Sequence, residues 1–377
     1  MLKSKSFLAA LAVFALSGSA PIHAQVGPAA IAEPFKLGTF QTSGAPFVGI
    51  VLRDSLVIDA GAANAELLRN PNAPAVTLPA DMLGVISAYE YGVQRRLYDI
   101  VNWAVKGNLL AGSGRASWVH DVGKVRTLAP ILYPSKILNA AANYYAHAGE
   151  SSSPEEAKKI EADLRKNRGT PYLFLKPTLG AIIGQGDDFV LPAGRDRIDW
   201  ECEIGVVIGR AAKNVPAAEA KNYIFGYTIS LDMSDRGTRP GETGPSRFGT
   251  DWYVGKGHDT FSPMGPWIVP KEFYGDPQNV RQLLTVNGKA MQDARSTDMV
   301  HTISELVEFG SSIMTLFPGD LISAGSPAGT GMSRTVRTEQ IFLKPGDKIE
   351  ATIDGIGTLH HTARPEIPAL SMSKPLR

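Results

Sequence analysis

Two glutamates set into an apolar run are the residues of this sequence best placed to do chemistry. Glu201 and Glu203 lie within residues 198–209, a predicted β-strand on which side chains two positions apart share one face. A second apolar run, 224–232, ends in Asp232. Buried carboxylates repel one another unless a cation lies between them, and oxygen-only ligands favour Mg²⁺, Mn²⁺ or Ca²⁺ over zinc. Taken alone, the same pattern also fits solvated edge residues paired with arginine.

A histidine and a glutamate form a second pair with catalytic chemistry. His147 and Glu150 are three positions apart, so in a helical turn their side chains are neighbours. A carboxylate beside an imidazole orients the ring and raises its basicity, which prepares a water molecule for attack. A histidine with a purely structural role also fits this pair, so the context has to decide.

Three further segments bring groups that bind anions. Lys176 ends the apolar strand predicted at 171–177, and Lys256 lies between glycines, where a ligand can approach closely. A cation at Lys256 could hold a substrate carboxylate or a developing enolate. The turn at 318–331 is rich in Gly and small residues, so its backbone N–H groups and the Ser326 hydroxyl could form an anion-binding concavity.

The elements that precede these residues predict a small N-terminal α/β domain, residues 25–130. Residues 25–46 are rich in Gly and Pro and are expected to be partly extended. The hairpin and the two helices predicted from the hydrophobic pattern are 47–52 with 56–59, 62–69 and 81–106. Nothing in this domain suggests chemistry, so the function is expected in residues 131–377, where short β-rich runs alternate with Gly and Pro.

An amphipathic helix is predicted as an insertion at 153–169. Ser153 is a good N-cap, Pro154 suits the first turn and Glu156 completes a capping box. The apolar residues that follow recur at helical spacing. The helix is either a lid over a site or a surface helix.

The composition excludes several classes of function. The 377 residues, 44% of them hydrophobic, suffice for one large domain and a smaller one. A formal net charge of +1 without a basic stripe argues against nucleic acid as a partner. The single cysteine, Cys202, excludes an intramolecular disulfide.

The first residues have the pattern of a secretory signal peptide, 1–24. Lysines precede an apolar run at 7–16 that is too short to span a bilayer, and cleavage is expected after Ala24. A retained membrane anchor is the alternative. No later stretch has the length and apolar character of a transmembrane helix, so we expect an exported, periplasmic mature protein with no membrane partner.

Taken in order, these segments resemble the fumarylacetoacetate hydrolase superfamily over roughly residues 129–362. No single motif is decisive, but their number and order are specific. The matching motifs are Asn-Tyr-x-x-His-x-x-Glu (143–150), Phe-Leu-Lys-Pro (174–177), Glu-x-Glu (201–203), Asp-x-Ser-x-Arg (232–236), Gly-Lys-Gly-x-Asp-Thr-Phe (255–261), Pro-Gly-Asp-x-Ile (318–322) and Lys-Pro-Gly-Asp-x-Ile-Glu (344–350).

The resemblance implies a β-rich α+β fold, a roll or sandwich of mixed β-sheets around a metal ion, assembled as a homodimer. Members act on small oxo-acids by hydrolysis, decarboxylation, isomerisation or hydration, and ureidoglycolate lyase belongs to the same group. The residues that match the family's functional positions divide into three sets. They are the ligands of Mg²⁺ or a similar ion, Glu201, Glu203 and Asp232; the water-activating pair on a mobile segment, His147 and Glu150; and the substrate contacts, Lys256, Lys176 and Arg236.

Four departures from the family pattern leave these residues in place and affect the expected substrate. Ala142 replaces the usual Gly before Asn-Tyr, and Ala-Gly-Ser-Pro at 324–327 replaces Thr-Gly-Thr-Pro. Arg239 stands where many members have Gln, and it either favours a dianionic substrate or pairs with a surface acid. His258 replaces a common Phe, and the sequence suggests no role for it.

Three functions remain open on this basis. The first is a metal-dependent hydrolase that cleaves a C–C bond in a β-diketo acid, such as an acylpyruvate or fumarylpyruvate. The second is a lyase, isomerase or decarboxylase that acts on a related oxo-acid or ureidoglycolate. The third is a non-catalytic exported binding protein whose metal only stabilises the fold, although such a protein would not need His147, Glu150 and Lys256.

Overall fold

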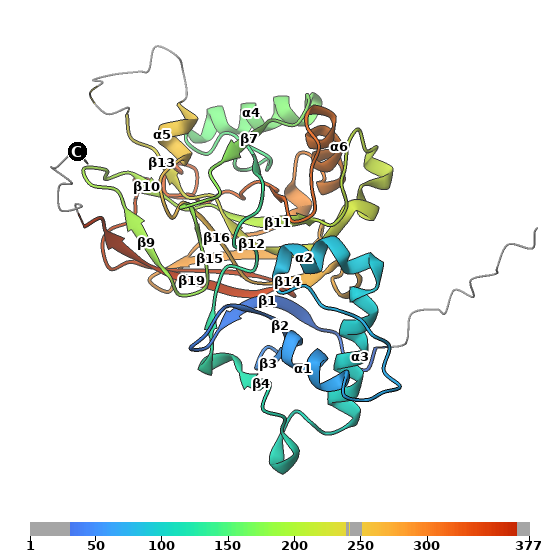
Figure 1. Ribbon diagram of the computed structural model, residues 1–377. Helices are drawn as coiled ribbons and strands as arrows, with labels where there is room; N and C mark the ends of the chain where they lie inside the picture. The colour runs from blue at the N-terminus through green and yellow to red at the C-terminus, as the bar shows by residue number, and fades with distance from the viewer. Residues whose placement is uncertain (1–30, 239–240, 242–250, 368–377) are drawn as a thin grey trace, which may run out of the picture. The chain divides into compact units, whose positions relative to one another are not determined.

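The computed structural model describes residues 31–238, 241 and 251–367 of the chain. Within these residues, the strands form a twelve-stranded sheet, a five-stranded sheet and a two-stranded pair. This architecture confirms the predicted β-rich α+β class with mixed sheets (Figure 1). The predicted signal peptide, 1–24, and Arg239 lie outside the described residues and stay predictions.

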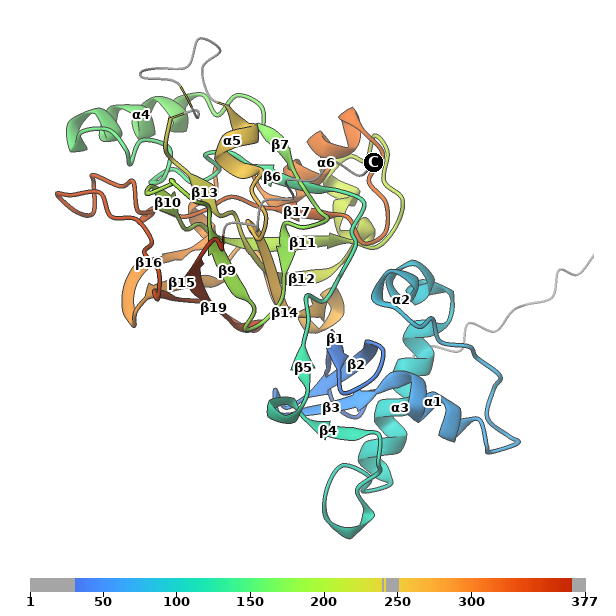
Figure 2. The same ribbon diagram turned by 60° about the vertical axis from the view of Figure 1, so that its left-hand side comes forward.

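The first part of the described chain is an antiparallel set of strands that packs against helices (Figure 2). The elements are β1 (Lys36–Gln41), β2 (Phe47–Leu52), β3 (Leu56–Asp59), α1 (Ala60–Leu67), α2 (Met82–Ala88), α3 (Val93–Lys106), β4 (Val119–Asp121) and β5 (Arg126–Thr127). The predicted hairpin is confirmed as β2 and β3. Within residues 31–46, the expected extended part is β1, which pairs with β2 and, at Leu37, with Ile268 of β14 (Ser262–Pro270), and residues 25–30 lie outside the described residues. The predicted division at residue 130 stays a prediction.

The single helix predicted at 81–106 is wrong in one respect, because the structure interrupts it. Helix α2 ends at Ala88, a short 3₁₀ turn spans Tyr89–Tyr91, and α3 begins at Val93. Between them, Gly92 has φ of 113°, a left-handed conformation that a helix does not contain and that glycine adopts at little cost.

The centre of the large sheet is a pair of fully buried antiparallel strands, β11 (Cys202–Ile208) and β12 (Ile224–Leu231). On one side, β12 pairs with β14, and on the other side β11 is followed by three further strands. These are β17 (Leu321–Ser323), β6 (Ile137–Ala140) and β7 (Leu173–Lys176), of which β7 is the edge. The register of β11 with β12 sets Glu203 opposite Ser230, and the Asp232 N–H donates to the Glu201 carbonyl at 3.0 Å. The two strands therefore bring their acidic ends together.

The strand predicted at 198–209 is broken near its start. Strand β10 (Ile198–Asp199) pairs with β13 (Ser234–Asp235) in the separate two-stranded pair, and β11 begins only at Cys202. The Asp199 carboxylate accepts the N–H of Trp200 at 2.8 Å, so a side chain replaces the partner that a neighbouring strand would offer. The chain changes sheets here, with Glu201 at the junction.

The second sheet lies in the C-terminal half and runs in the order β16, β15, β18, β19, β9. It is antiparallel except for the parallel contact of β19 with β9. Its strands are β9 (Asp188–Leu191), β15 (Arg281–Val286), β16 (Lys289–Arg295), β18 (Lys348–Ile353) and β19 (Gly357–Pro365). The same half of the chain contains helices α5 (Trp252–Lys256) and α6 (Ile303–Ile313), and the short strand β8 (Ile182–Ile183) pairs with β14 in the large sheet. Among the described residues, no helix combines the length and apolar character needed to cross a membrane.

The predicted insertion helix is confirmed as α4 (Pro154–Lys166). The Ser153 hydroxyl accepts the Glu156 N–H at 3.3 Å, as the capping pattern predicts. The helix lies on the surface, and no residue of it is fully buried (Figure 1). It packs on the preceding turn, because a Cβ at Gly149 would lie only 2.8 Å from Ala157 Cα.

Candidate active site

Three carboxylates meet where β10 and β12 end and β11 begins. Glu201 precedes β11, Glu203 lies on it and Asp232 follows β12, and one oxygen of each lies within 4.8 Å of the others. All three residues are buried, with exposed fractions of 4%, 1% and 2%. The structure thus brings together the three predicted metal ligands.

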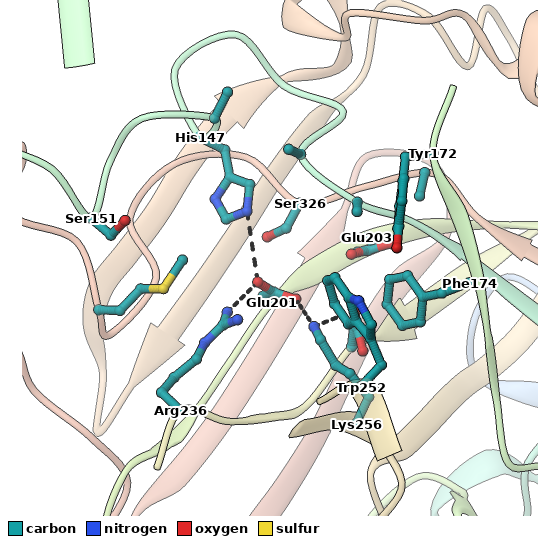
Figure 3. Close-up of a pocket in the computed structure, with 16 residues that line it drawn as sticks. His147, Ser151, Tyr172, Phe174, Glu201, Glu203, Arg236, Trp252, Lys256 and Ser326 are labelled. Atoms are coloured by element: carbon teal, nitrogen blue, oxygen red, sulfur yellow. Dashed lines mark hydrogen bonds and ion pairs between the residues drawn. The ribbon is translucent and has the colours of Figure 1, made fainter. Parts of the chain in front are cut away.

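Two basic side chains bind the carboxylates of this cluster from the cavity side. The Lys256 ammonium, at the end of α5, donates to Glu201 Oε2 at 2.7 Å, Asp232 Oδ2 at 2.6 Å and the Ser234 hydroxyl at 2.6 Å. The Arg236 guanidinium donates to another Glu201 oxygen (Figure 3). Burial alone would raise the pKa of Glu201, but the Lys256 and Arg236 charges hold it well below its usual value.

Lys176 lies behind Asp232 and is not among the residues that line the cavity. Its ammonium donates to Asp232 Oδ1 at 2.6 Å, to the Phe261 carbonyl at 2.5 Å and to the Met233 carbonyl at 3.2 Å. These bonds use its three donors. A direct substrate contact for Lys176 stays a prediction, and its contacts favour a role in positioning Asp232.

The donor set fits a hard divalent cation. It offers carboxylate oxygens only, the ligands that Mg²⁺, Mn²⁺ and Ca²⁺ prefer. Burial and the neighbouring Asp232 and Glu201 charges raise the pKa of Glu203 to about 8, so a further positive charge at this point would stabilise its ionised form. One Glu203 oxygen is already oriented by the Gly325 N–H at 2.8 Å.

His147 and Glu150 face this cluster from a tight turn rather than a regular helix. His147 Nδ1 lies 2.7 Å from Glu150 Oε1. His147 Nε2 lies 3.7 Å from Glu201 Oε1 (Figure 3). Burial opposes the charge on His147, but the Glu150 hydrogen bond and charge raise its pKa above the ordinary value. The predicted pair therefore exists, with one imidazole nitrogen held by Glu150 and the other turned towards the carboxylates.

The turn at 318–331 does bind anions, but they are the protein's own carboxylates. Gly325 N–H donates to Glu203, and Gly329 N–H donates to Glu150 at 2.6 Å. Gly331 N–H donates to Asp199. These three N–H groups of the predicted concavity are therefore taken up by buried acidic side chains.

The Ser326 hydroxyl lines the cavity and is held in place by neighbours. It accepts from Gln292 Nε2 at 2.8 Å and lies 3.3 Å from the Pro327 carbonyl. Its predicted contact with substrate stays a prediction.

The cavity in front of the carboxylates measures about 640 Å³. One wall is aromatic and was missed by sequence reasoning: the Phe174 and Trp252 rings stack at 4.4 Å with an interplanar angle of 25°. Lys256 Nζ lies 5.5 Å from the Phe174 ring centre. Because β7 and α5 are brought together only by the fold, no spacing in the sequence reveals this wall.

Asp199 is a second residue that sequence reasoning missed. It is fully buried, and its carboxylate accepts from Arg236 Nε at 3.1 Å and from Met332 N–H at 3.2 Å. It therefore fixes the guanidinium that binds Glu201. The sequence does contain a pattern that could have identified it, because acidic residues alternate at 199, 201 and 203.

His258 lies behind the site and not on the cavity wall. Its Nε2 is 3.2 Å from Asp235 Oδ2, and its ring packs against Phe261 at 4.8 Å. The polar ring at a position where the family commonly has Phe thus keeps the aromatic packing and adds a hydrogen-bond partner for Asp235.

Comparison with known proteins agrees with this geometry. The profile of the fumarylacetoacetate (FAA) hydrolase C-terminal family matches residues 136–364, more than half of the chain. The chain belongs to this family. A 2,4-didehydro-3-deoxy-L-rhamnonate hydrolase of Sphingomonas sp. (strain SKA58) is 36% identical over 236 residues, 63% of this chain and 75% of that protein. A mitochondrial oxaloacetate tautomerase of Bos taurus is 34% identical over 236 residues, 63% of this chain and 68% of that protein.

A solved structure carries the similarity into the N-terminal part. Maleylpyruvate hydrolase from Sphingobium sp. SYK-6, in complex with manganese(II) and pyruvate, superimposes with a TM-score of 0.63 at 27% identity. The match covers 88% of this chain and 100% of that one. These relatives support an enzyme with the fumarylacetoacetate hydrolase fold.

Proposed function

We propose that this protein is a metal-dependent hydrolase that cleaves a C–C bond in a small β-diketo acid of the acylpyruvate type. The observation that carries the proposal is the position of His147 Nε2, 3.7 Å from the buried carboxylate cluster, while Glu150 holds its other nitrogen at 2.7 Å. The carboxylates proposed to hold a metal ion and the histidine proposed to activate water thus line the same cavity. A relative crystallised with manganese and pyruvate supports this assignment.

The chain's own residues supply the proton transfers. Glu150 accepts the Nδ1–H of His147, which leaves Nε2 free to take a proton from water. The water oxygen bonds to the distal carbonyl carbon, and the C–C bond towards the 2-oxo end then breaks. The electron pair of that bond becomes the enolate of pyruvate, which takes up the proton that His147 Nε2 removed from the water, and the distal part leaves as a carboxylic acid.

Glu201, Glu203 and Asp232 would hold a divalent ion, Mg²⁺ or Mn²⁺ in the first instance. When bound, it would supply electrostatic stabilisation for the charge that develops on the 2-oxo acid end. Lys256 adds a positive charge at the same place, because Asp232 and Glu201 raise its pKa above its ordinary value although burial opposes this.

A second function is an isomerase, lyase or decarboxylase reaction on a related oxo-acid, and of these the similarity to oxaloacetate tautomerase favours tautomerisation, an isomerisation. In that reaction the His147 and Glu150 pair would move a proton between carbon and oxygen without adding water. The same residues serve both reactions, so the products have to distinguish them. Homodimer formation and export of the mature protein remain proposals as well.

The test is product analysis on acetylpyruvate, fumarylpyruvate, oxaloacetate and ureidoglycolate, with His147→Ala beside the wild type. The proposal expects pyruvate and a second acid in equal amounts from a diketo acid, and their loss in the variant. Turnover of oxaloacetate alone would establish the second function. Metal binding without turnover of any of these acids would leave a binding protein.

A further inference from the structure

A second hollow of about 570 Å³ adjoins the active-site cavity. The two share the walls formed by Ala141, Ala142, Ala148 and Tyr172, so the hollow starts where the cavity ends. Three of these four shared residues are alanines, whose short side chains take up little space between the cavity and the hollow. A substrate bound at the carboxylates can therefore extend into this space.

The far wall of the hollow is the apolar stripe of α4. Ile160 and Leu164 line it, together with Val300 from the segment before α6. The stripe residues Ala157, Ile160 and Leu164 are only half-buried, and no residue of α4 is fully buried. An apolar ligand in the hollow would complete the burial of this stripe, which is favourable in proportion to the area removed from water.

The charged side chains Arg168 and Asp163, which line the hollow, already have partners. Arg168 donates to the Val300 carbonyl at 2.8 Å and forms an ion pair with Glu305 at 3.0 Å. Asp163 lies 3.7 Å from Lys166, and the Asn167 side chain accepts the Gly169 N–H at 3.2 Å. Among the described residues that line the hollow, the basic side chains are Arg168, whose charge is matched by Glu305, and His301, whose pKa is lowered by burial.

We infer that the hollow beneath α4 binds the tail of the substrate's acyl group and that this tail is an uncharged hydrocarbon chain. The inference rests on the proposed function, and it names the substrate class as acylpyruvates with medium-length alkyl chains. A terminal carboxylate, as in fumarylpyruvate, would reach the hollow without an unpaired cation to receive it and would lose hydration.

The test is the dependence of kcat/KM on acyl length in the series acetyl-, butanoyl-, hexanoyl- and octanoylpyruvate, with fumarylpyruvate beside it. Each methylene that enters the hollow should raise kcat/KM roughly fourfold, the factor that corresponds to about 0.8 kcal/mol per buried CH₂. Fumarylpyruvate should be poorer than butanoylpyruvate. Equal values across the alkyl series, or a preference for fumarylpyruvate, would overturn the inference.

A variant in α4 tests whether the increase of kcat/KM with acyl length arises in the hollow. Leu164→Ser should flatten the increase with chain length, whereas Lys159→Ser, on the exposed face of the same helix, should keep it. The readout is the ratio of octanoyl- to acetylpyruvate, which a general loss of activity does not change. A slope that Leu164→Ser leaves unchanged would place the tail elsewhere.

Binding of unreactive acids separates this inference from the proposed function. Pyruvate, 2-oxobutanoate, 2-oxohexanoate and 2-oxooctanoate lack the second carbonyl, so they cannot undergo the cleavage. Calorimetry in the presence of Mn²⁺ should show affinity that rises with chain length in the wild type and less steeply in Leu164→Ser. If diketo acids are not cleaved but this rise is seen, only the hydrolase proposal fails. Affinity that does not rise with chain length, or no binding at all, would refute the inference that the hollow binds the acyl tail.

Discussion

Replacing Glu150 by Gln tests whether the carboxylate orients His147. Glu150 is fully buried and accepts three hydrogen bonds, from Gly329 N–H at 2.6 Å, from the Thr330 hydroxyl at 2.5 Å and from His147 Nδ1 at 2.7 Å. A glutamine offers one oxygen and one NH₂ group, so its NH₂ must face one of these donors. Either Gly329 N–H loses its partner, or the imidazole must take the tautomer with hydrogen on Nε2.

The expected losses of stability and of activity can both be estimated. A buried donor without a partner costs about 1–3 kcal/mol, so the free energy of unfolding should fall by that amount. Loss of the general base should lower kcat about 10²- to 10⁴-fold. Steady-state cleavage of an acylpyruvate and urea unfolding measure the two effects, with Glu155→Gln in the exposed first turn of α4 as the matched control. A Glu150→Gln enzyme with both wild-type kcat and wild-type free energy of unfolding would refute the assignment of the pair.

Two further predictions concern buried charges. Lys176→Met removes one of the two ammonium groups that pair with Asp232. Because Lys256 remains, the metal-free protein should lose an amount near the lower end of the about 3–5 kcal/mol typical of a broken buried pair, and an unchanged urea midpoint would contradict this. His361 is buried with no partner for Nε2, and burial lowers its pKa to about 4. The free energy of unfolding is therefore unaffected by His361 above the pKa of histidine in the unfolded chain, near 6.5. It falls by about 3 kcal/mol as the pH decreases from there to 4. His361→Asn, which can still donate to the Asp187 carbonyl, should reduce that loss, and identical pH profiles would contradict the reasoning.

Much of the site follows from local patterns. Period-two alternation and the antiparallel register of two apolar strands suffice to bring Glu203 near Asp232, and the capping residues around Ser153 locate α4 to within a few positions. The resemblance to the family then supplied what spacing alone left open. It gave the three acids and the His147 pair a common role, and the family profile confirms the resemblance.

The remaining features depend on contacts that no local pattern contains. The break before Cys202 arises because the Asp199 side chain satisfies a backbone donor, and the stacking of Trp252 on Phe174 needs β7 and α5 to meet. The donors of the 318–331 turn were expected to bind a ligand, and they bind Glu203, Glu150 and Asp199 because the fold buries those acids beside them.

The most direct test of the central claim is a metal titration of acylpyruvate cleavage. Protein stripped with a chelator should release no pyruvate, and Mn²⁺ or Mg²⁺ should restore cleavage with one equivalent of pyruvate and of carboxylic acid per substrate. Glu203→Gln, which removes one proposed ligand, should require a much higher metal concentration for the same rate. Full cleavage by the stripped wild-type protein, verified as metal-free, would contradict the account.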